Sequence, residues 1–413
     1  MIIKRDYYLQ QLISSKSNNL IKIVTGIRRS GKSFLLFNLF HNHLIETGVS
    51  EDHIIEIALD DRLNKNLRDP DVILQHIHER IVDDKLYYII LDEVQMIDEF
   101  TDVLNSLLHI RNADVYVTGS NSKFLSKDVV TEFRGRGDEI HLFPLSFAEL
   151  YNSIGGDKFE LWKSYYTYGG LPGILELDSE KKKAAYLRSL HETVYLKDII
   201  ERNNLKNSEE FMELMRVMAS CIGSPCNPSK LENTFKSVKN ETLDRKTISK
   251  YLSYMEDAFL IEKSMRYDIK GRKYIGTLSK YYFQDIGLRN ALLNFRQVEE
   301  NHIMENVIYN ELRLRGFCVD VGMVETRTAT ERKQLEVDFV ANMADRRYYI
   351  QSAFAMPDND KREQESASLK RIDDSFKKII IMRDDIKPYH DNNGFYIVGL
   401  MDFLLKPDLI EQL

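Results

Sequence analysis

The stretch that decides the fold is residues 21–33, which read IKIVTGIRRSGKS. A short run rich in β-branched apolar residues leads into the pattern Gly-x-x-x-x-Gly-Lys-Ser, and the apolar residues 34–36 then open a helix. A strand, a glycine-rich loop and a helix in this order form a P-loop, which binds the phosphates of a nucleotide. The alternative, a glycine-rich turn with a chance lysine, leaves the flanking strand and helix unexplained.

Each residue type in this loop has a role in binding phosphate. Gly26 and Gly31 allow positive φ, so successive N–H groups can turn inward around an anion, and the following helix adds its N-terminal partial charge. Lys32 is placed to reach the β- and γ-phosphates, and the hydroxyl of Ser33 to bind Mg²⁺. We therefore predict ATP and Mg²⁺ as cofactors. The predicted nucleotide contacts are Gly26, Ile27, Arg28, Arg29, Ser30, Gly31, Lys32, Ser33 and Phe34.

The composition is that of a soluble globular protein with more than one domain. The chain has 413 residues, of which 43% are hydrophobic and 29% charged, so we expect two or three domains. A net charge of -7 argues against a uniformly basic surface for nucleic acid, although it leaves room for a local basic patch. Three cysteines cannot form a disulfide framework, and no second Cys/His pair suggests zinc. The charged N-terminus and the lack of a long apolar run predict a cytoplasmic protein without a membrane segment.

Four further strand-like runs follow the P-loop, and the first three of them end in polar residues. They cover residues 54–59, 86–91, 114–120 and 139–143, and helical stretches separate them. This alternation predicts an α/β fold with a parallel, doubly wound sheet. Because ligands bind at the carboxyl ends of such strands, the polar residues found there are candidates for the nucleotide site.

The pair Asp92-Glu93 closes one of these runs and has the pattern of a Walker B motif. Asp92 would hold Mg²⁺, and Glu93 would polarise the attacking water. The alternative is an acidic cap of the next helix. Ser120 and Asn121, at the end of the next strand, could contact the γ-phosphate or the attacking water, although Thr-Gly-Ser-Asn is also a plain turn.

Arg136 lies in the loop Arg134-Gly135-Arg136-Gly137. An arginine beside a nucleotide site can stabilise the charge that develops in phosphoryl transfer, whereas a charged loop is otherwise solvated surface. The predicted catalytic residues are therefore Lys32, Asp92, Glu93, Asn121 and Arg136, with Ser33 and Asp92 as metal ligands.

Several motifs occur together in one order along the chain. They are residues 26–33 (GIRRSGKS), 91–95 (LDEVQ), 118–121 (TGSN), Arg136, 143–150 (FPLSFAEL), 168–173 (YGGLPG) and 335–340 (LEVDFV). This order resembles the prokaryotic AAA-type ATPases whose C-terminal half is the domain called DUF4143, over nearly the whole chain. The resemblance implies an AAA+-like P-loop NTPase core, a helical lid, a winged helix and a C-terminal α/β domain that resembles restriction endonucleases. The predicted domains are 1–150 (ATPase), 151–205 (lid), 206–292 (winged helix) and 293–413 (nuclease-like).

The middle of the chain contains a candidate surface for DNA. The turn at residues 169–172 looks like the family's lid element over the nucleotide, or is a simple turn between helices. A helix at 247–255 precedes two strand-like runs, 260–267 and 273–275, a pattern typical of a winged helix. Both runs lie in or beside a locally basic stretch from Lys263 to Lys280. Such a stretch indicates salt-sensitive DNA binding. The alternatives are a hairpin that is merely solvated and a hairpin that docks a protein. The candidate DNA contacts are Arg245, Lys246, Lys250, Lys270, Arg272 and Lys273.

The C-terminal region looks like a nuclease core that has lost key groups. Its candidate site comprises Glu305, Glu336, Asp338 and Gln351, and alternation places Glu336 and Asp338 on one strand face. The resemblance places Gln351 where the family has an acid, and Ala353 where it has the lysine that activates water. Lys333 or Lys361 could replace that lysine. Since magnesium sites favour charged oxygens, we expect no nuclease activity and a docking role for DNA or protein instead.

The leading hypothesis is an ATPase that acts as a switch or motor on DNA or a protein partner, and that can form a homo-oligomer. Two alternatives stay open. One is an ATP-gated, Mg²⁺-dependent DNA nuclease, and the other is a nucleotide-sensing scaffold with negligible turnover.

Overall fold

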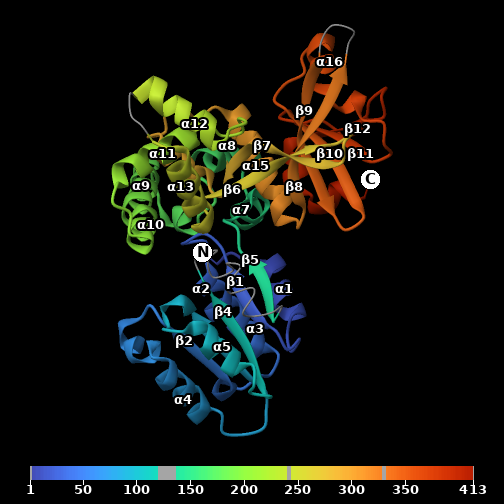
Figure 1. The fold of residues 1–413 in the computed structure, drawn as a ribbon. Coiled ribbons are helices and arrows are strands. Elements are labelled where there is room, and N and C mark those ends of the chain that lie inside the picture. Colours follow the sequence, from blue (N-terminus) through green and yellow to red (C-terminus); the bar gives the residue numbers. More distant parts are fainter. Residues whose placement is uncertain (1, 120–135, 240–242, 328–331, 413) are drawn as a thin grey trace. The chain divides into compact units, whose positions relative to one another are not determined.

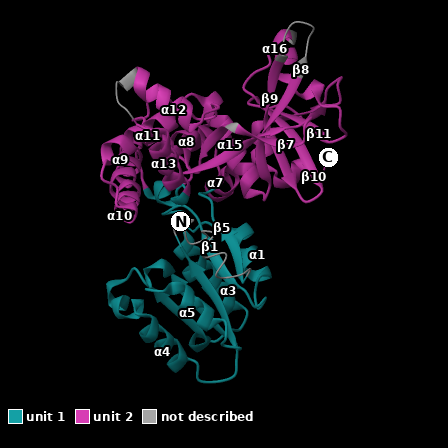
Figure 2. Ribbon diagram, viewed as in Figure 1, with its two compact units in different colours: residues 1–145, 171–176, 257–259 teal, residues 146–170, 177–256, 260–413 magenta. Residues whose placement is uncertain are grey.

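The protein is described here by a computed structural model that covers residues 2–119, 136–239, 243–327 and 332–412. The chain divides into two compact units (Figure 2). The first comprises residues 1–145, 171–176 and 257–259, and the second comprises residues 146–170, 177–256 and 260–413. The prediction for Asn121 falls outside the described residues.

The first unit is built on a five-stranded sheet in the order β2-β3-β4-β1-β5. All of its strand pairs are parallel, which confirms the predicted α/β fold with a parallel sheet. The strands are β1 (Ile21–Thr25), β2 (Ile54–Ala58), β3 (Tyr87–Asp92), β4 (Ala113–Thr118) and β5 (Gly137–His141).

Helices cover both faces of this sheet (Figure 1). Successive strand residues alternate between two hydrophobic clusters, as Ile89 and Ile90 of β3 do. One cluster includes side chains from α4 and α5, and the other includes side chains from α1 and the helix after the P-loop. The bounds are α1 (Asp6–Ser14), α2 (Lys32–Phe34), η1 (Leu35–Phe40), α3 (His41–Glu46), η2 (Glu51–His53), η3 (Arg62–Arg68), α4 (Pro70–Arg80), η4 (Val94–Met96), α5 (Phe100–Leu107) and η6 (Pro172–Glu176).

The second unit combines a helical part with an eight-stranded mixed sheet in the order β12-β13-β11-β10-β9-β8-β6-β7. Its strands are β6 (Ile261–Asp268), β7 (Lys273–Phe283), β8 (Cys318–Arg327), β9 (Arg332–Met343), β10 (Arg346–Ala353), β11 (Lys377–Met382), β12 (Tyr389–His390) and β13 (Tyr396–Gly399). Its helices are α7 (Phe147–Ile154), α8 (Lys158–Tyr168), α9 (Glu180–Leu190), η7 (His191–Leu196), α10 (Lys197–Asn203), α11 (Ser208–Ser220), α12 (Pro228–Thr234), η8 (Phe235–Lys239), α13 (Arg245–Asp257), α14 (Ile286–Leu292), α15 (Glu300–Leu314), α16 (Asn359–Ser366), η9 (Leu369–Arg371), α17 (Leu400–Leu405) and η10 (Pro407–Ile410).

The hairpin predicted as a wing is part of this large sheet. Strands β6 and β7 pair antiparallel, and β6 also pairs in parallel with β8 through residues 266–268. The sheet therefore crosses the domain boundary that we predicted at 292/293, because backbone hydrogen bonds join the hairpin to the C-terminal strands. Helix α13 does precede the hairpin, as predicted, but β7 is much longer than the predicted run 273–275.

Candidate functional site

The P-loop follows β1 and holds its two glycines at positive φ. Gly26 has φ 138° and Gly31 has φ 99°. A Cβ atom added to Gly26 would lie 2.2 Å from the carbonyl oxygen of Leu142, so the chain segment after β5 requires glycine there. Gly31 has no such steric neighbour, and its positive φ alone favours glycine. A helical run without interruption follows from residue 32 to residue 46.

Two further contacts shape the loop, and neither was anticipated from the sequence. The buried guanidinium group of Arg5 donates to the carbonyl oxygens of Ser30, at 3.2 Å, and Phe143, at 2.7 Å. The ring of Pro172 lies 3.8 Å from where a Cβ atom of Gly31 would stand. Residues 171–176 thus belong to the same compact unit as the P-loop, which places part of the predicted lid turn beside it.

Lys32 is buried, with 5% of its surface exposed. Its Nζ donates to the carbonyl oxygens of Gly26, at 3.0 Å, and Ile27, at 3.2 Å, within its own loop. Burial lowers the pKa of Lys32, and the carboxylates of Glu93 and Asp92 oppose this shift. The lysine and the two acids are therefore close enough to interact electrostatically.

The predicted metal ligands lie together. Asp92 ends β3 and is buried, and the hydroxyl of Ser33 hydrogen-bonds to its carboxylate. Thr118, at the end of β4, donates from Oγ1 to Asp92 Oδ1 at 2.5 Å. Burial raises the pKa of Asp92, while the hydrogen bonds from Thr118 and Ser33 work against the increase. A divalent cation bound at this carboxylate would relieve the cost of burying its charge.

Glu93 has a strained backbone conformation. Its φ is 54°, in the left-handed region that non-glycine residues adopt at an energetic cost. Thr118 Oγ1 accepts a hydrogen bond from the Glu93 N–H at 2.9 Å, and Gln95 Nε2 donates to Glu93 Oε2. Neither Thr118 nor Gln95 was among the predicted site residues, although both lie in the motifs that carry the family resemblance.

The structure separates Arg136 from the P-loop. Its carbonyl oxygen accepts a hydrogen bond from the N–H of Ile21 at 2.9 Å, so it lies where β1 begins. The P-loop follows the other end of β1, roughly 15 Å away at the rise of a strand. Arg136 therefore does not act on the P-loop of its own chain, which corrects that part of our prediction. The sequence does not distinguish these two positions, because the loop before a strand and the loop after it have similar compositions.

A second site lies in the C-terminal sheet and centres on Lys280 of β7, whose exposed fraction is 2%. The Lys280 Nζ lies 2.8 Å from Glu305 Oε1, 2.8 Å from Glu336 Oε1 and 3.6 Å from Asp338 Oδ1. Three of the four residues that we predicted as a vestigial nuclease site therefore surround one buried ammonium group.

The remaining contacts of this cluster complete its hydrogen bonding. Tyr282 donates to Glu305 Oε1 at 2.7 Å, and the Ser352 N–H donates to Asp338 Oδ2 at 2.9 Å. Gln351 lies nearby, with its Oε1 3.4 Å from the N–H of Asp338. Burial and the charge of Glu305 raise the pKa of Asp338 to about 7. Burial opposes the charge of Lys280, but the three carboxylates outweigh it and raise its pKa.

Lys280 corrects our expectation about the lysine of this site. We considered Lys333 or Lys361 as replacements for Ala353, and counted Lys280 among the basic residues of the wing. Lys361 instead pairs with Glu365 at 2.7 Å, while Ala353 is buried among apolar side chains. Alternation along β7 places Lys280 on the same strand face as Tyr282, and a lysine in such an apolar run was the available signal.

The described residues offer no group of three or more His, Cys, Asp or Glu side chains that could hold a metal ion. In the second site, the ammonium group of Lys280 already occupies the position between the carboxylates of Glu305, Glu336 and Asp338 that a metal ion would need. We therefore find no support for a metal centre there.

The six candidate DNA contacts are exposed and fall into two groups. Arg245, Lys246 and Lys250 lie at the start and middle of α13. Lys270 and Arg272 lie in the turn between β6 and β7, and Lys273 is the first residue of β7. The Nζ atom of Lys270 lies 3.9 Å from Oδ2 of Asp373, which is in the loop before β11. In the part of the chain that the structure describes, no helix is long and apolar enough to cross a membrane.

Comparison with known proteins identifies the first part of the chain. A family model described as an AAA domain matches residues 18–151. Residues 159–299 match a domain of unknown function, DUF8612, in place of the DUF4143 that we expected. A solved structure of the Aeropyrum pernix ORC1 protein in complex with DNA aligns with a TM-score of 0.29 and 11% identity, over 71% of this chain and 92% of that one.

Two relatives align over most of their length. An uncharacterized protein MJ1544 of Methanocaldococcus jannaschii is 29% identical over 90% of this chain and 82% of its own length. An uncharacterized protein of Haemophilus influenzae is 33% identical over 98% of this chain and 99% of its own length. The chain therefore belongs to the same family as the Haemophilus influenzae protein. Its own residues 18–151 match an AAA domain, the type found in nucleotide-driven ATPases.

Proposed function

We propose that the first unit binds Mg·ATP and hydrolyses it to ADP and phosphate. The observation that carries this proposal is the convergence of Lys32, Ser33, Asp92 and Glu93 at the carboxyl ends of β1 and β3, linked to β4 through Thr118. These are the groups that phosphoryl transfer requires, since the reaction depends on positioning and charge stabilisation.

The residues present fit a nucleotide and its metal ion. Lys32 donates its hydrogen bonds to carbonyl oxygens of its own loop. The buried Ser30 Oγ has no hydrogen-bond partner among the described residues. Both side chains can thus turn to phosphate oxygens without breaking a contact to another part of the fold. Asp92 and Ser33 would hold Mg²⁺, which when bound neutralises charge on the phosphate oxygens.

The chain's own residues would then act on water. Glu93 accepts a proton from the water that attacks the γ-phosphorus, while the bond from that phosphorus to the β–γ bridging oxygen breaks. Gln95 holds the Glu93 carboxylate, and Thr118 fixes the backbone of Glu93. Each of these contacts limits the motion of the base before the nucleotide arrives, so less ordering is needed during the reaction.

Lys32→Ala tests the phosphate-binding role. We expect ATP to bind about 10- to 150-fold more weakly, as is typical when a charged hydrogen bond of about 1.5 to 3 kcal/mol is lost. The measurement is the Kd of a fluorescent ATP analogue in the presence of Mg²⁺. Lys65→Ala, at an exposed lysine of η3 in the same unit, should bind as the unchanged protein does. Unchanged affinity in the Lys32 variant would remove the P-loop from the site.

We further propose that the ATPase acts as a switch or motor, and that its second unit engages DNA or a protein partner. A nucleotide-sensing scaffold is the alternative, and it would show negligible ATP turnover with or without DNA. The molecular mass of the protein in solution, measured with ATP and with ADP, would show whether it forms a homo-oligomer and whether the bound nucleotide changes its oligomeric state.

The nuclease alternative is not favoured by the second site. Lys280 supplies one positive charge among three carboxylates and fills the space between them. We expect no nicking of supercoiled plasmid in Mg²⁺ or Mn²⁺, whether or not ATP is present. Nicking that disappears in Asp338→Asn, but persists in Asp373→Asn at an exposed loop, would instead establish a nuclease.

A further inference from the structure

Two adjoining pockets open around Phe376 in the second unit, and we call them the Phe376 pockets. The first, of about 530 Å³, is lined by the β6–β7 turn, by Arg347 of β10 and by residues 372–374 and 376. The second, of about 650 Å³, is lined by residues 369, 370, 372, 374–378 and 393–395. They share Ile372, Asp374 and Phe376 as lining residues, so they form one continuous surface.

The surface of these pockets is basic, although the chain as a whole is acidic. Six basic and two acidic residues line them, against a net charge of -7 for the chain. The basic residues are Lys270, Arg272, Arg347, Lys370, Lys377 and Lys378. Three of the lysines form ion pairs: Lys378 with Asp374 at 3.9 Å, Lys270 with Asp373 at 3.9 Å, and Lys370 with Glu363 at 2.6 Å. The other three basic residues leave an excess of positive charge.

An aromatic ring stands within this basic surface. Phe376 is 37% exposed, so this large apolar side chain is partly open to solvent. The guanidinium carbon of Arg347 lies 5.2 Å from the centre of the Phe376 ring and 5.5 Å from that of Tyr267. This contact between the cation and two rings restrains Arg347 and orients Phe376.

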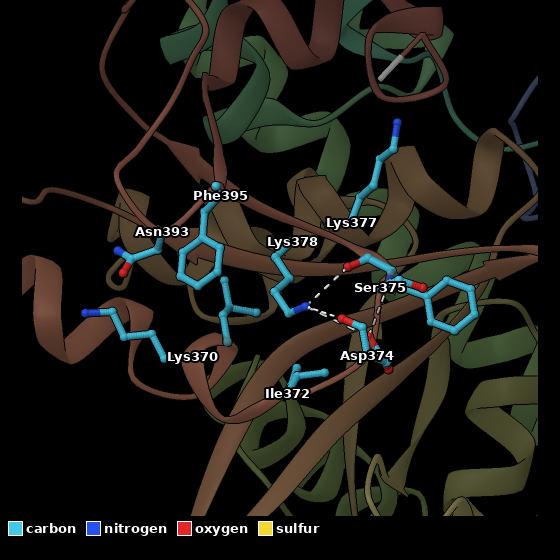
Figure 3. Close-up of a pocket in the computed structure, with 11 residues that line it drawn as sticks. Lys370, Ile372, Asp374, Ser375, Lys377, Lys378, Asn393 and Phe395 are labelled. Atoms are coloured by element: carbon cyan, nitrogen blue, oxygen red, sulfur yellow. Dashed lines mark hydrogen bonds and ion pairs between the residues drawn. The ribbon is translucent and has the colours of Figure 1, made fainter.

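Figure 3 shows how the second pocket combines apolar and basic side chains. Lys378 lies between Phe395 and Ile372, and Lys370 and Lys377 lie farther out on opposite sides. Phe395 and Ile372 are almost fully buried, so the floor is part of the hydrophobic core. A ligand that combines negative charge with a flat or apolar group would complement these side chains.

We infer that the Phe376 pockets bind single-stranded nucleic acid. The phosphates would pair with the basic rim, and an unpaired base would stack on Phe376. A duplex hides the faces of its bases, so it could use the charges but not the ring. The inference narrows the DNA partner of the proposed function, yet it needs no ATP binding or hydrolysis by the first unit.

The test measures fluorescence anisotropy of a labelled oligonucleotide without ATP, using a single strand and its duplex. Phe376→Ala should weaken single-strand binding about 5- to 150-fold, as one base–aromatic stack accounts for about 1 to 3 kcal/mol, and should leave duplex binding unchanged. Phe376→Leu, which keeps an apolar side chain, should lose most of the same affinity. Phe159→Ala is the matched control, because Phe159 is also exposed and lies beside a lysine, on α8.

Charge is tested separately. Neutralising Arg272 and Lys377 together (to Gln) should reduce the slope of log Kd against log salt concentration by about 1.4, or about 0.7 per phosphate contact. Lys163→Gln with Lys181→Gln, at exposed lysines of α8 and α9, should leave the slope unchanged.

Equal binding of duplex and single strand, or full affinity in both Phe376 variants, would overturn the inference. Binding of polyglutamate as tight as that of the single strand would point to an acidic protein partner instead. A protein that binds the single strand but not ATP would contradict only the proposed function, so the two failures are distinguishable.

Discussion

Glu93→Gln is expected to lower the rate of ATP hydrolysis by about 10²- to 10⁴-fold, the usual contribution of a general base. Glutamine has nearly the same shape and can still accept the hydrogen bond from Gln95, but it cannot take a proton from water. Because the P-loop and the Asp92–Ser33 pair stay intact, ATP should bind with unchanged affinity. The variant is therefore expected to hold ATP without turning it over.

The measurement is kcat for phosphate release beside the Kd of a fluorescent ATP analogue. Glu99→Gln is the matched control, because Glu99 follows the same strand, is exposed and also has a positive φ, at 51°. It should keep full turnover. Normal turnover in Glu93→Gln would show that another group is the base, and absent turnover in the unchanged protein would favour the scaffold alternative.

Lys280→Met is expected to destabilise the second unit by about 3 to 5 kcal/mol, the cost typical of removing one partner from a buried ion pair. Methionine fills a similar volume but leaves Glu305, Glu336 and Asp338 without their shared cation. Their mutual repulsion in a buried site then opposes folding. Lys263→Met, at an exposed position on the hairpin's other strand, should cost far less.

The loss should depend on pH with a defined sign. Burial and the charge of Glu305 raise the pKa of Asp338 to about 7, and the charge of Lys280 limits this increase. Without Lys280 the pKa of Asp338 rises further, so the stability lost on mutation is small in acid and grows as pH rises through the pKa of Asp338. Urea unfolding between pH 5 and pH 8 measures this trend. The triple variant Lys280→Met, Glu305→Gln, Asp338→Asn should recover part of the loss. A pH-independent loss equal to that of Lys263→Met would show that the charge of Lys280 does not hold the cluster together.

The nucleotide site could be predicted in detail because its signals are local. The glycines, Lys32 and Ser33 lie within one loop, and Asp92 and Glu93 follow one apolar strand. In a parallel sheet the carboxyl ends of neighbouring strands meet at one edge, so the topology brings these local signals together. Arg136 shows the limit of such reasoning, since the same topology places the start of β5 at the opposite edge.

The sequence by itself determined the P-loop, the parallel α/β fold around it and the acids that face it. Only the tertiary structure decided that Lys280 lies among the C-terminal carboxylates and that the hairpin joins the C-terminal sheet. The physical reason is that periodicity and loop chemistry are properties of neighbouring residues, and these specify strands, helices and turns. The Lys280 cluster depends on residues distant in the chain, such as Lys280 and Glu305, 25 positions apart. Strand pairing and packing bring these residues together, and a local sequence pattern does not predict such contacts.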